Sequence, residues 1–250
     1  MNIAIIGYGK MGHEIEKAAK VKGIKVVSVI DTNDTDANYN EINGKSMQNV
    51  DVCIDFTTPY AVINNIKKIA KFKKNIVVGT TGWYNEINEV EEIVKKYDIG
   101  LIYASNFSIG VNVFFKIIEC AAKMIDKLED YDIYGYEIHH NKKIDCPSGT
   151  AKTIGEILIS NIKRKKKMLF EKIDRKIKPN ELHFASVRAG SIPGAHIVGF
   201  DSSADTIELS HIARNREGFA LGAIMAAEWI KNKKGFYDIN DLMENIIGGN

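Results

Sequence analysis

Three glycines near the start of the chain constrain its fold more than any other feature. Gly7, Gly9 and Gly12 form a GxGxxG pattern that follows the apolar run Asn2–Ile6 and opens an amphipathic segment. In a strand–turn–helix unit, the first glycine permits the tight turn, the second lets the backbone approach a pyrophosphate, and the third lets helix and strand pack closely. A dinucleotide site is therefore predicted, in preference to a glycine turn that binds nothing. Its expected contacts in this turn are Gly7, Tyr8, Gly9, Lys10, Met11 and Gly12.

A carboxylate stands where a dinucleotide site needs one. Asp31 lies 19 residues after Gly12, at the end of the second expected strand. There it can accept hydrogen bonds from both ribose hydroxyls, and it would repel a 2′-phosphate. Because no arginine follows it directly, NADH is favoured as the cofactor and NADPH stays possible.

Up to about residue 107, short Ile/Val-rich runs alternate with amphipathic segments, as in βαβ units with a parallel sheet. The expected strands are Asn2–Ile6, Lys25–Ile30, Asp51–Ile54, Asn75–Val78 and Ile99–Tyr103, and the expected helices are Met11–Val21, one after Pro59, and Asn85–Tyr97, with residues 31–49 as a loop. Ligands bind beyond the carboxyl ends of such strands. Two loops at these ends are therefore expected at the cofactor: Gly79, Thr80 and Thr81, then Ala104, Ser105, Asn106 and Phe107.

After Phe107 the pattern changes to that of an α+β domain. The expected elements are a long helix over Phe114–Ile125, strands Asp132–Ile138, Leu182–Arg188, His196–Phe200 and Thr206–His211, a helix from Ser148, a helix over Phe219–Lys231 and a short tail helix. The predicted fold class is α/β, a Rossmann-type dinucleotide-binding domain joined to an α+β domain. Periodicity alone leaves open which of the two domains the final helices pack against.

Composition excludes several classes of protein. The net charge is only +2, and the longest apolar run, Phe219–Ala227, is nine residues, so neither a nucleic-acid partner nor a membrane is expected. Three cysteines and an N-terminus without a basic leader indicate the reducing cytoplasm and no disulfide framework. The nine basic and two acidic residues of Lys163–Lys178 are interpreted as a solvated helix end and loop in preference to an anion-attracting patch.

The densest cluster of chemically useful side chains lies between Glu137 and Thr150. Ser148 is a suitable N-cap for the helix that follows. The N–H groups of Gly149 and Thr150 would then point at an anion such as a substrate carboxylate, and glycine leaves room for it to approach. Ser148, Gly149 and Thr150 are therefore expected to bind substrate. A polar surface loop before a capped helix is the simpler alternative.

Two histidines and a lysine precede this helix start. His139, His140 and Lys143 can donate protons to a dianionic substrate or hold it in place. A metal is the rival explanation of the paired histidines. Adjacent side chains point in different directions in extended chain, however, and no third ligand follows at a recognisable spacing, so no metal is expected. Cys146 is taken as a bystander.

The run His139-x-x-x-Lys143-x-Asp145-x-Pro147-Ser148-Gly149-Thr150-Ala151 resembles the signature of the dihydrodipicolinate reductase family. The likeness extends to the glycine turn, Gly79–Gly82, Asn106–Asn112, Ser186–Gly190 and His211–Phe219. The resemblance implies NAD(P)H-dependent reduction of 4-hydroxy-tetrahydrodipicolinate, with loss of water, in diaminopimelate and lysine biosynthesis. It also implies a dinucleotide-binding domain of residues 1–107 plus 217–250, a substrate-binding and tetramerisation domain of residues 108–216, and a homotetramer.

Roles follow from the same resemblance. His139 matches the catalytic histidine and Lys143 the proton donor, and which of them delivers the proton stays open. His140 joins the substrate-binding set, and Arg216 and Phe219 are expected near the nicotinamide. Departures are small: Cys146 and Ser105 replace alanines, and Tyr134 stands where an acid is usual. Two alternatives remain, another two-domain NAD(P)-dependent oxidoreductase such as an amino-acid dehydrogenase, and a non-catalytic NAD-sensing module.

Overall fold

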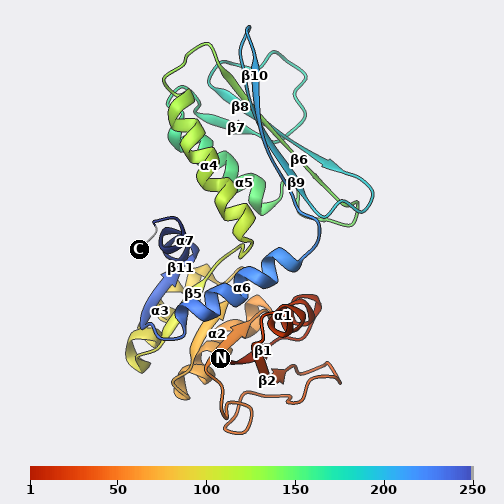
Figure 1. Cartoon of the computed structure of the whole chain (residues 1–250). Helices are drawn as coiled ribbons and strands as arrows, with labels where there is room; N and C mark the ends of the chain where they lie inside the picture. The colour runs from red at the N-terminus through yellow and green to blue at the C-terminus, as the bar shows by residue number, and fades with distance from the viewer. Residues whose placement is uncertain (249–250) are drawn as a thin grey trace. The chain divides into compact units, whose positions relative to one another are not determined.

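The chain forms two compact units in the computed structural model, which describes residues 1–248 (Figure 1). Unit 1 consists of Met1–Ile109 together with the chain from Arg216 onward, and unit 2 consists of Gly110–Asn215. Unit 2 is thus inserted into unit 1 between two of its elements. Each unit has a hydrophobic core of its own.

Within the described residues, the sheet of unit 1 has six parallel strands in the order β2-β1-β3-β4-β5-β11. They are β1 (Asn2–Ile6), β2 (Lys25–Ile30), β3 (Val52–Asp55), β4 (Asn75–Val78), β5 (Gly100–Tyr103) and β11 (Gly235–Asp238). The chain runs from β1 to β2 on one side and then crosses back to β3 on the other. The strand order therefore reverses between β1 and β3, where open parallel sheets bind ligands at their carboxyl ends.

Helices cover both faces of this sheet, which explains why its strands are short runs of Ile and Val. Helices α1 (Lys10–Val21) and α6 (Glu217–Ile230) share one core with the sheet, and α2 (Pro59–Lys71) and α3 (Ile87–Tyr97) share the other. The short 3₁₀ helix Tyr84–Glu86 precedes α3, and α7 (Ile239–Ile247) follows β11. The first five strands and the helices were predicted to within a few residues. The strand β11 was missed, because four half-buried residues carry no alternation.

Asn75 joins the end of α6 to the sheet and settles which unit that helix packs against. Its buried side-chain amide donates to the carbonyl oxygens of Ile230, Lys231 and Lys233 at 2.7, 3.0 and 3.0 Å. Its Oδ1 accepts the Gly100 N–H at 2.7 Å. One side chain therefore satisfies the carbonyls that a helix C-terminus leaves over and a backbone donor at the start of β5.

Unit 2 has a mixed five-stranded sheet within the described chain, in the order β10-β9-β6-β8-β7. Its strands are β6 (Asp132–His139), β7 (Lys167–Leu169), β8 (Glu181–Arg188), β9 (Ala195–Asp201) and β10 (Thr206–Ile212). Helices α4 (Ile109–Ile125) and α5 (Gly149–Asn161) pack on one face, with Phe114, Ile118 and Leu158 in their shared core. Along β6 the residues that face the helices are buried and the intervening ones are half-exposed, because strand side chains alternate between faces.

Most basic side chains of segment 163–178 are exposed, as its interpretation as a solvated helix end and loop expects, but two features depart from it. Residues 167–169 form β7, and Lys165 just before it is 2 % exposed. The Lys165 ammonium donates to the carbonyl oxygens of Pro179 and Glu181 and pairs with Asp132 at 2.5 Å. Part of this positive charge is therefore structural, because a buried ammonium needs such partners. Among residues 1–248, no helix combines the length and apolar character needed to cross a bilayer.

Candidate active site

The glycine turn lies at the carboxyl end of β1, where the strand order of unit 1 reverses. Gly7 has φ +88°, and a Cβ there would lie 2.4 Å from the Phe56 carbonyl oxygen. A Cβ at Gly12 would lie 2.4 Å from the Gly7 oxygen. A Cβ at Gly9 would meet no atom of residues 1–248 within 4 Å. Gly7 and Gly12 are thus required by the fold, whereas Gly9 leaves open space in front of the start of α1, as a bound phosphate requires.

Asp31 follows β2 and reaches back to this turn. Its Oδ2 accepts the Tyr8 N–H at 2.7 Å, and its Oδ1 accepts the N–H groups of Asn33 and Asp34 at 2.8 and 3.2 Å. Burial alone would raise the pKa of Asp31, but these three backbone donors lower it, so the group is ionised. The carboxylate therefore holds the glycine turn in shape, a role that the sequence reasoning did not include.

The surroundings of Tyr8 are acidic. Its phenol is buried and hydrogen-bonded to Glu16. Burial and this carboxylate, with Asp34 and Asp36 nearby, raise the pKa of Tyr8 to about 12. With Asp31, these carboxylates place concentrated negative charge beside the turn, which disfavours a further phosphate there.

The other predicted cofactor residues of unit 1 divide by exposure. Ala104, Phe107 and Thr80 are buried, whereas Lys10, Thr81, Ser105 and Arg216 are exposed and Met11, Gly79, Asn106 and Phe219 lie between. Asn106 Oδ1 accepts the Ser108 N–H at 2.8 Å. The Phe107 ring packs in the core of unit 1. Phe107 can therefore offer a ligand its backbone more readily than its ring.

The loop after β4 is shaped by packing. A Cβ at Gly79 would lie 2.1 Å from the ring of Phe56, so this glycine makes room for an aromatic side chain. The Thr80 hydroxyl donates to the fully buried Asp55 at 2.8 Å and accepts the Thr57 N–H at 2.7 Å. Gly79 and Thr80 thus hold the carboxyl ends of β3 and β4 together.

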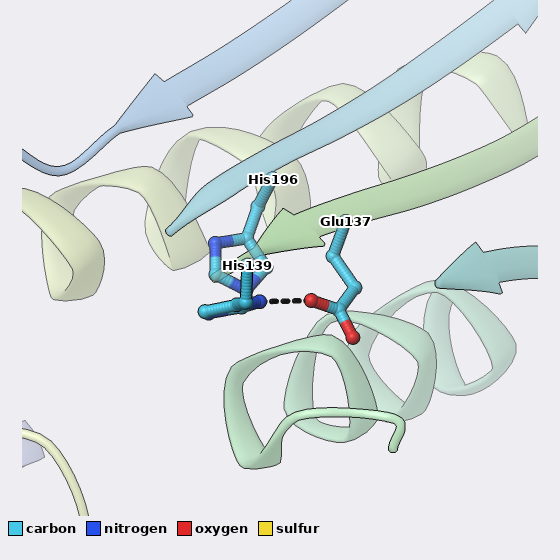
Figure 2. Close-up of side chains that lie close together, drawn as sticks. All are labelled: Glu137, His139 and His196. Atoms are coloured by element: carbon cyan, nitrogen blue, oxygen red, sulfur yellow. Dashed lines mark hydrogen bonds and ion pairs between the residues drawn. The ribbon is translucent and has the colours of Figure 1, made fainter. Parts of the chain in front are cut away.

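In unit 2 the predicted catalytic histidine belongs to a buried pair (Figure 2). Glu137 and His139 lie two residues apart on β6, so both point to the face that α4 and α5 cover. His139 Nδ1 and Glu137 Oε2 are hydrogen-bonded. Glu137 is fully buried and His139 is 7 % exposed. A role was predicted from sequence for His139 and none for Glu137, although their spacing on a strand could have indicated the pair.

Three further groups surround this pair. Arg188, opposite His139 on β8, donates to Glu137 Oε1 at 2.8 Å, and the Ser148 N–H donates to the same oxygen at 3.2 Å. His196, opposite Glu137 on β9, lies with its ring edge-on to that of His139 at 5.2 Å between ring centres. Arg188 and His196 come from strands distant in sequence, so local spacing gave no signal for either.

Lys143 and His140 lie in the loop after β6. The Lys143 ammonium donates to both carboxylate oxygens of Asp145 at 2.7 and 2.8 Å, and its side chain is 21 % exposed. His140 is partly exposed, and its backbone N–H donates to the Ile192 carbonyl oxygen at 2.8 Å. Its side chain is not in the buried cluster with His139, as expected for adjacent residues of an extended chain.

Helix α5 begins as predicted. The Ser148 hydroxyl accepts the Ala151 N–H at 3.2 Å, as an N-cap does, and lies 3.1 Å from His196 Nε2. Burial lowers the pKa of His196 to about 4, so its imidazole is neutral near pH 7. Ser148 is buried, and both its hydroxyl and its N–H already have hydrogen-bond partners in the protein. This favours a positioning role over direct substrate contact. Gly149 is exposed at the first turn, and Thr150 is half-buried.

Glu137, His139 and His196 together have the donor types of a transition-metal site, with ligand atoms within 4.8 Å of one another. The sequence reasoning considered a metal on His139 with His140, whereas the structure gathers a different set. The Glu137 carboxylate already pairs with His139 and with the Arg188 guanidinium. The Arg188 guanidinium would repel a metal cation on that carboxylate, so the cluster is better suited to holding a proton than a metal.

A parallel dinucleotide-type sheet with a mixed sheet in an inserted unit is an architecture of two-domain oxidoreductases that use NAD(P)H. A family model described as dihydrodipicolinate reductase, N-terminus, matches residues 1–107, and one described as dihydrodipicolinate reductase, C-terminus, matches residues 110–243. The chain belongs to the dihydrodipicolinate reductase family.

Two relatives match this chain over almost their full length. The 4-hydroxy-tetrahydrodipicolinate reductase of Christiangramia forsetii is 39% identical over 247 residues, which cover 99% of each chain. That of Archaeoglobus fulgidus is 38% identical over 263 residues, covering 98% of this chain and 100% of the relative.

Solved structures share the fold. A dipicolinate-bound dihydrodipicolinate reductase from Paenisporosarcina sp. TG-14 superposes with a TM-score of 0.79 at 23% identity, over 97% of this chain and 99% of the other. A C. glutamicum DAP dehydrogenase in complex with DAP has a TM-score of 0.54 at 15% identity over 99% of both chains. The same architecture therefore serves more than one reaction, and the site must decide between them.

Proposed function

We propose that this chain reduces 4-hydroxy-tetrahydrodipicolinate to tetrahydrodipicolinate with NAD(P)H, with loss of water, in diaminopimelate and lysine biosynthesis. The observation that carries the proposal is the grouping of Lys143, the Glu137–His139 pair and the start of α5 at one end of the unit 2 sheet. During its reduction, a small ring with two carboxylates needs groups that bind a carboxylate and a group that donates a proton. Membership of the family supports the same activity.

In this proposal the chain binds both reactants through helix N-termini. The start of α1, Gly9 and Asp31 hold the cofactor, which supplies a hydride when bound. The N–H groups of Gly149 and Thr150 at the start of α5 hold a substrate carboxylate. His140, in the loop between β6 and α5, also binds the substrate. Fixing the substrate's acid groups aligns its acceptor carbon, which lowers the entropic part of the barrier.

We assign proton delivery to Lys143. Burial lowers the pKa of His139 despite the attraction of Glu137, so the imidazole is neutral near pH 7, and its Nδ1–H donates to the Glu137 carboxylate. An ammonium group has three N–H donors, and Lys143 directs two of them to Asp145. A positive charge that can release a proton stabilises the electron density that hydride transfer builds on the ring.

The expected coenzyme is NADH, with NADPH accepted less well, because of the carboxylates around the glycine turn. Changing Asp31→Asn should weaken NADH binding about tenfold while changing NADPH binding less, since it removes the charge that bonds ribose hydroxyls and repels a 2′-phosphate. Fluorescence titration of both coenzymes measures the ratio.

Glu14→Gln is the matched control, because Glu14 is a carboxylate on α1 that pairs with Lys17 on the surface. An equal loss of affinity for both coenzymes in Asp31→Asn would remove the ribose contact from the proposal and leave Asp31 only its bond to the Tyr8 N–H in the turn.

Gly149→Ala tests the substrate site without disturbing the fold. Among residues 1–248, no atom would lie within 4 Å of the added methyl, and alanine is the better helix former. Stability should therefore be unchanged or rise by up to about 1 kcal/mol, whereas the substrate KM should rise about tenfold because the methyl fills the space of the carboxylate. Gly44→Ala, with the same open surroundings in unit 1, is the control. An unchanged KM would remove the start of α5 from the substrate site.

We also propose a homotetramer in the cytoplasm. Among the described residues, helices pack on only one face of the unit 2 sheet, and the other carries Tyr134, Tyr136, Val187 and Ile212, with Val187 and Ile212 44 % and 66 % exposed. An apolar sheet face of this kind suits subunit assembly. Sedimentation at micromolar concentration checks the assembly. The cytoplasm suits the free thiols of Cys53, Cys120 and Cys146.

The test of the function is NADH and NADPH oxidation with freshly prepared 4-hydroxy-tetrahydrodipicolinate. Turnover inhibited by pyridine-2,6-dicarboxylate is the expected result. Activity with amino acids and no turnover of this substrate would indicate an amino-acid dehydrogenase. Coenzyme binding with no turnover of this substrate or of amino acids would indicate an NAD-sensing module.

A further inference from the structure

The carboxylate of Glu137 is the most completely enclosed charged group of unit 2. Its side chain has no exposed surface, and every neighbour that it contacts lies in or beside the proposed substrate site. Burying a carboxylate costs free energy that ion pairing often fails to offset. Replacement by apolar residues is frequently tolerated at purely structural positions. The placement of Glu137 therefore calls for a role beyond stability.

The two oxygens of Glu137 have different partners. Oε2 accepts a hydrogen bond from His139 Nδ1 (Figure 2), whereas Oε1 accepts from Arg188 at 2.8 Å and from the Ser148 N–H at 3.2 Å. Arg188 also donates to the Asp145 carbonyl oxygen at 2.7 Å, in the loop that carries Lys143. The carboxylate is thereby fixed from one side and can orient the imidazole on the other.

The charge states are consistent with this arrangement. Burial opposes ionisation of Glu137, but hydrogen bonds from Arg188 and His139 keep its pKa below the ordinary value. Burial lowers the pKa of His139. An ionised carboxylate beside a neutral imidazole can only accept, so Nδ1 must carry the imidazole proton and Nε2 must carry the lone pair.

Gly194 closes the other side of the ring. A Cβ at this position would lie 2.9 Å from His139 Nε2. The imidazole is therefore confined between Glu137 and the backbone at Gly194, and a ring flip would lose the bond to the carboxylate. His196, neutral and held by Ser148, packs edge-on against it.

We propose that Glu137 is a positioning residue, which fixes His139 in the Nδ1–H tautomer with Nε2 as an acceptor, and that Arg188 and the Ser148 N–H hold Glu137 in place for this purpose. The proposal rests on the proposed reductase function for its kinetic consequence only. The tautomer itself is a property of the protein without substrate.

The experiment combines imidazole ¹⁵N NMR at pH 7.5 with kinetics of the full-length chain. In the unaltered protein, the ¹⁵N shifts of His139, assigned with a His139→Gln variant, should be those of a neutral ring protonated at Nδ1. In Glu137→Gln the ring should become a mixture of tautomers, because an amide can either donate or accept. The kcat should fall at least about tenfold with an unchanged Kd for NADH, since a group in the wrong tautomer no longer presents its lone pair.

Glu181→Gln is the matched control. Glu181 is a buried glutamate on β8 of the same unit, and it forms a two-pronged pair with Arg175 at 2.8 Å for both bonds. Its loss should lower stability to a similar extent, while the His139 shifts and kcat stay as in the unaltered protein. The comparison separates positioning from a general effect of breaking the ion pair of a buried glutamate.

Three results would overturn the proposal. One is an Nε2–H or doubly protonated His139 in the unaltered protein, which does not require the Glu137→Gln variant to fold. Another is an active unaltered enzyme whose Glu137→Gln variant behaves like Glu181→Gln. The third is a Zn²⁺-dependent rise in Tm that Glu137→Gln abolishes, which would assign the cluster to a metal. An unaltered protein with the expected tautomer but without turnover would contradict the reductase function and leave the placement of the proton standing.

Discussion

Lys143→Ala is expected to lower kcat by about 10²- to 10⁴-fold, the range that positioned proton donors contribute, with no change in the Kd for NADH. Lys143 lies in the loop between the Glu137–His139 pair and the start of α5, and its ammonium is held by Asp145. Lys143 and Asp145 both belong to unit 2, whereas the proposed cofactor site lies in unit 1. Stopped-flow measurement of NADH oxidation and a fluorescence titration of NADH separate the two parameters.

Two comparisons sharpen this test. Lys142→Ala removes an exposed lysine next in sequence and should leave kcat within about twofold, as surface changes usually do. Lys143→Arg keeps the positive charge, but a guanidinium does not release its proton. It should retain part of the affinity for pyridine-2,6-dicarboxylate and still show the loss of kcat. Equal losses of kcat and NADH affinity in Lys143→Ala would show that the lysine supports the structure and does not deliver the proton.

Asn75→Ala is expected to lower the free energy of unfolding by about 3 kcal/mol, because it leaves the Gly100 N–H and the carbonyls at the end of α6 without their buried partner. Urea denaturation followed by circular dichroism measures the change. Asn161→Ala, which removes a bond to the Ile157 carbonyl within α5, should cost less than about 1 kcal/mol.

Asn75→Asp provides an internal check on the same site. The introduced carboxylate would face the carbonyl oxygens of Ile230, Lys231 and Lys233, so its pKa in the folded state should be raised. A group with a raised folded pKa adds stability as the pH falls, and the variant should therefore recover stability between neutral and acidic pH relative to Asn75→Ala. A variant that is as stable as the unaltered chain at pH 7 would mean that these carbonyls do not need the amide.

The parts of the molecule that sequence predicted well are those decided by neighbours along the chain. The turn at Gly7–Gly12 and the N-cap at Ser148 each need only a few consecutive residues, and both were predicted. Strands β7 and β11 escaped because three or four residues carry too little pattern. Such short elements are specified by the strand that they pair with.

The surroundings of His139 could not be predicted in the same way. Glu137, Arg188 and His196 stand on β6, β8 and β9, and they meet only because of the order and register of the sheet. The same holds for Gly79 in unit 1. Its place after a strand indicated a ligand, but the ring of Phe56 needs the space as well. Contacts made by residues distant in sequence decide both sites.

The insertion of unit 2 has a consequence for synthesis on the ribosome. Helix α6 supplies Ala220, Ala223, Ile224, Ala227 and Ile230 to the core on one face of the first sheet, yet it follows more than one hundred residues of unit 2, Gly110–Asn215. Until that helix emerges, the nascent cofactor-binding unit has its first five strands but an uncovered apolar surface. The inserted unit can complete its own core earlier, so its folding is expected to precede that of the segment translated first.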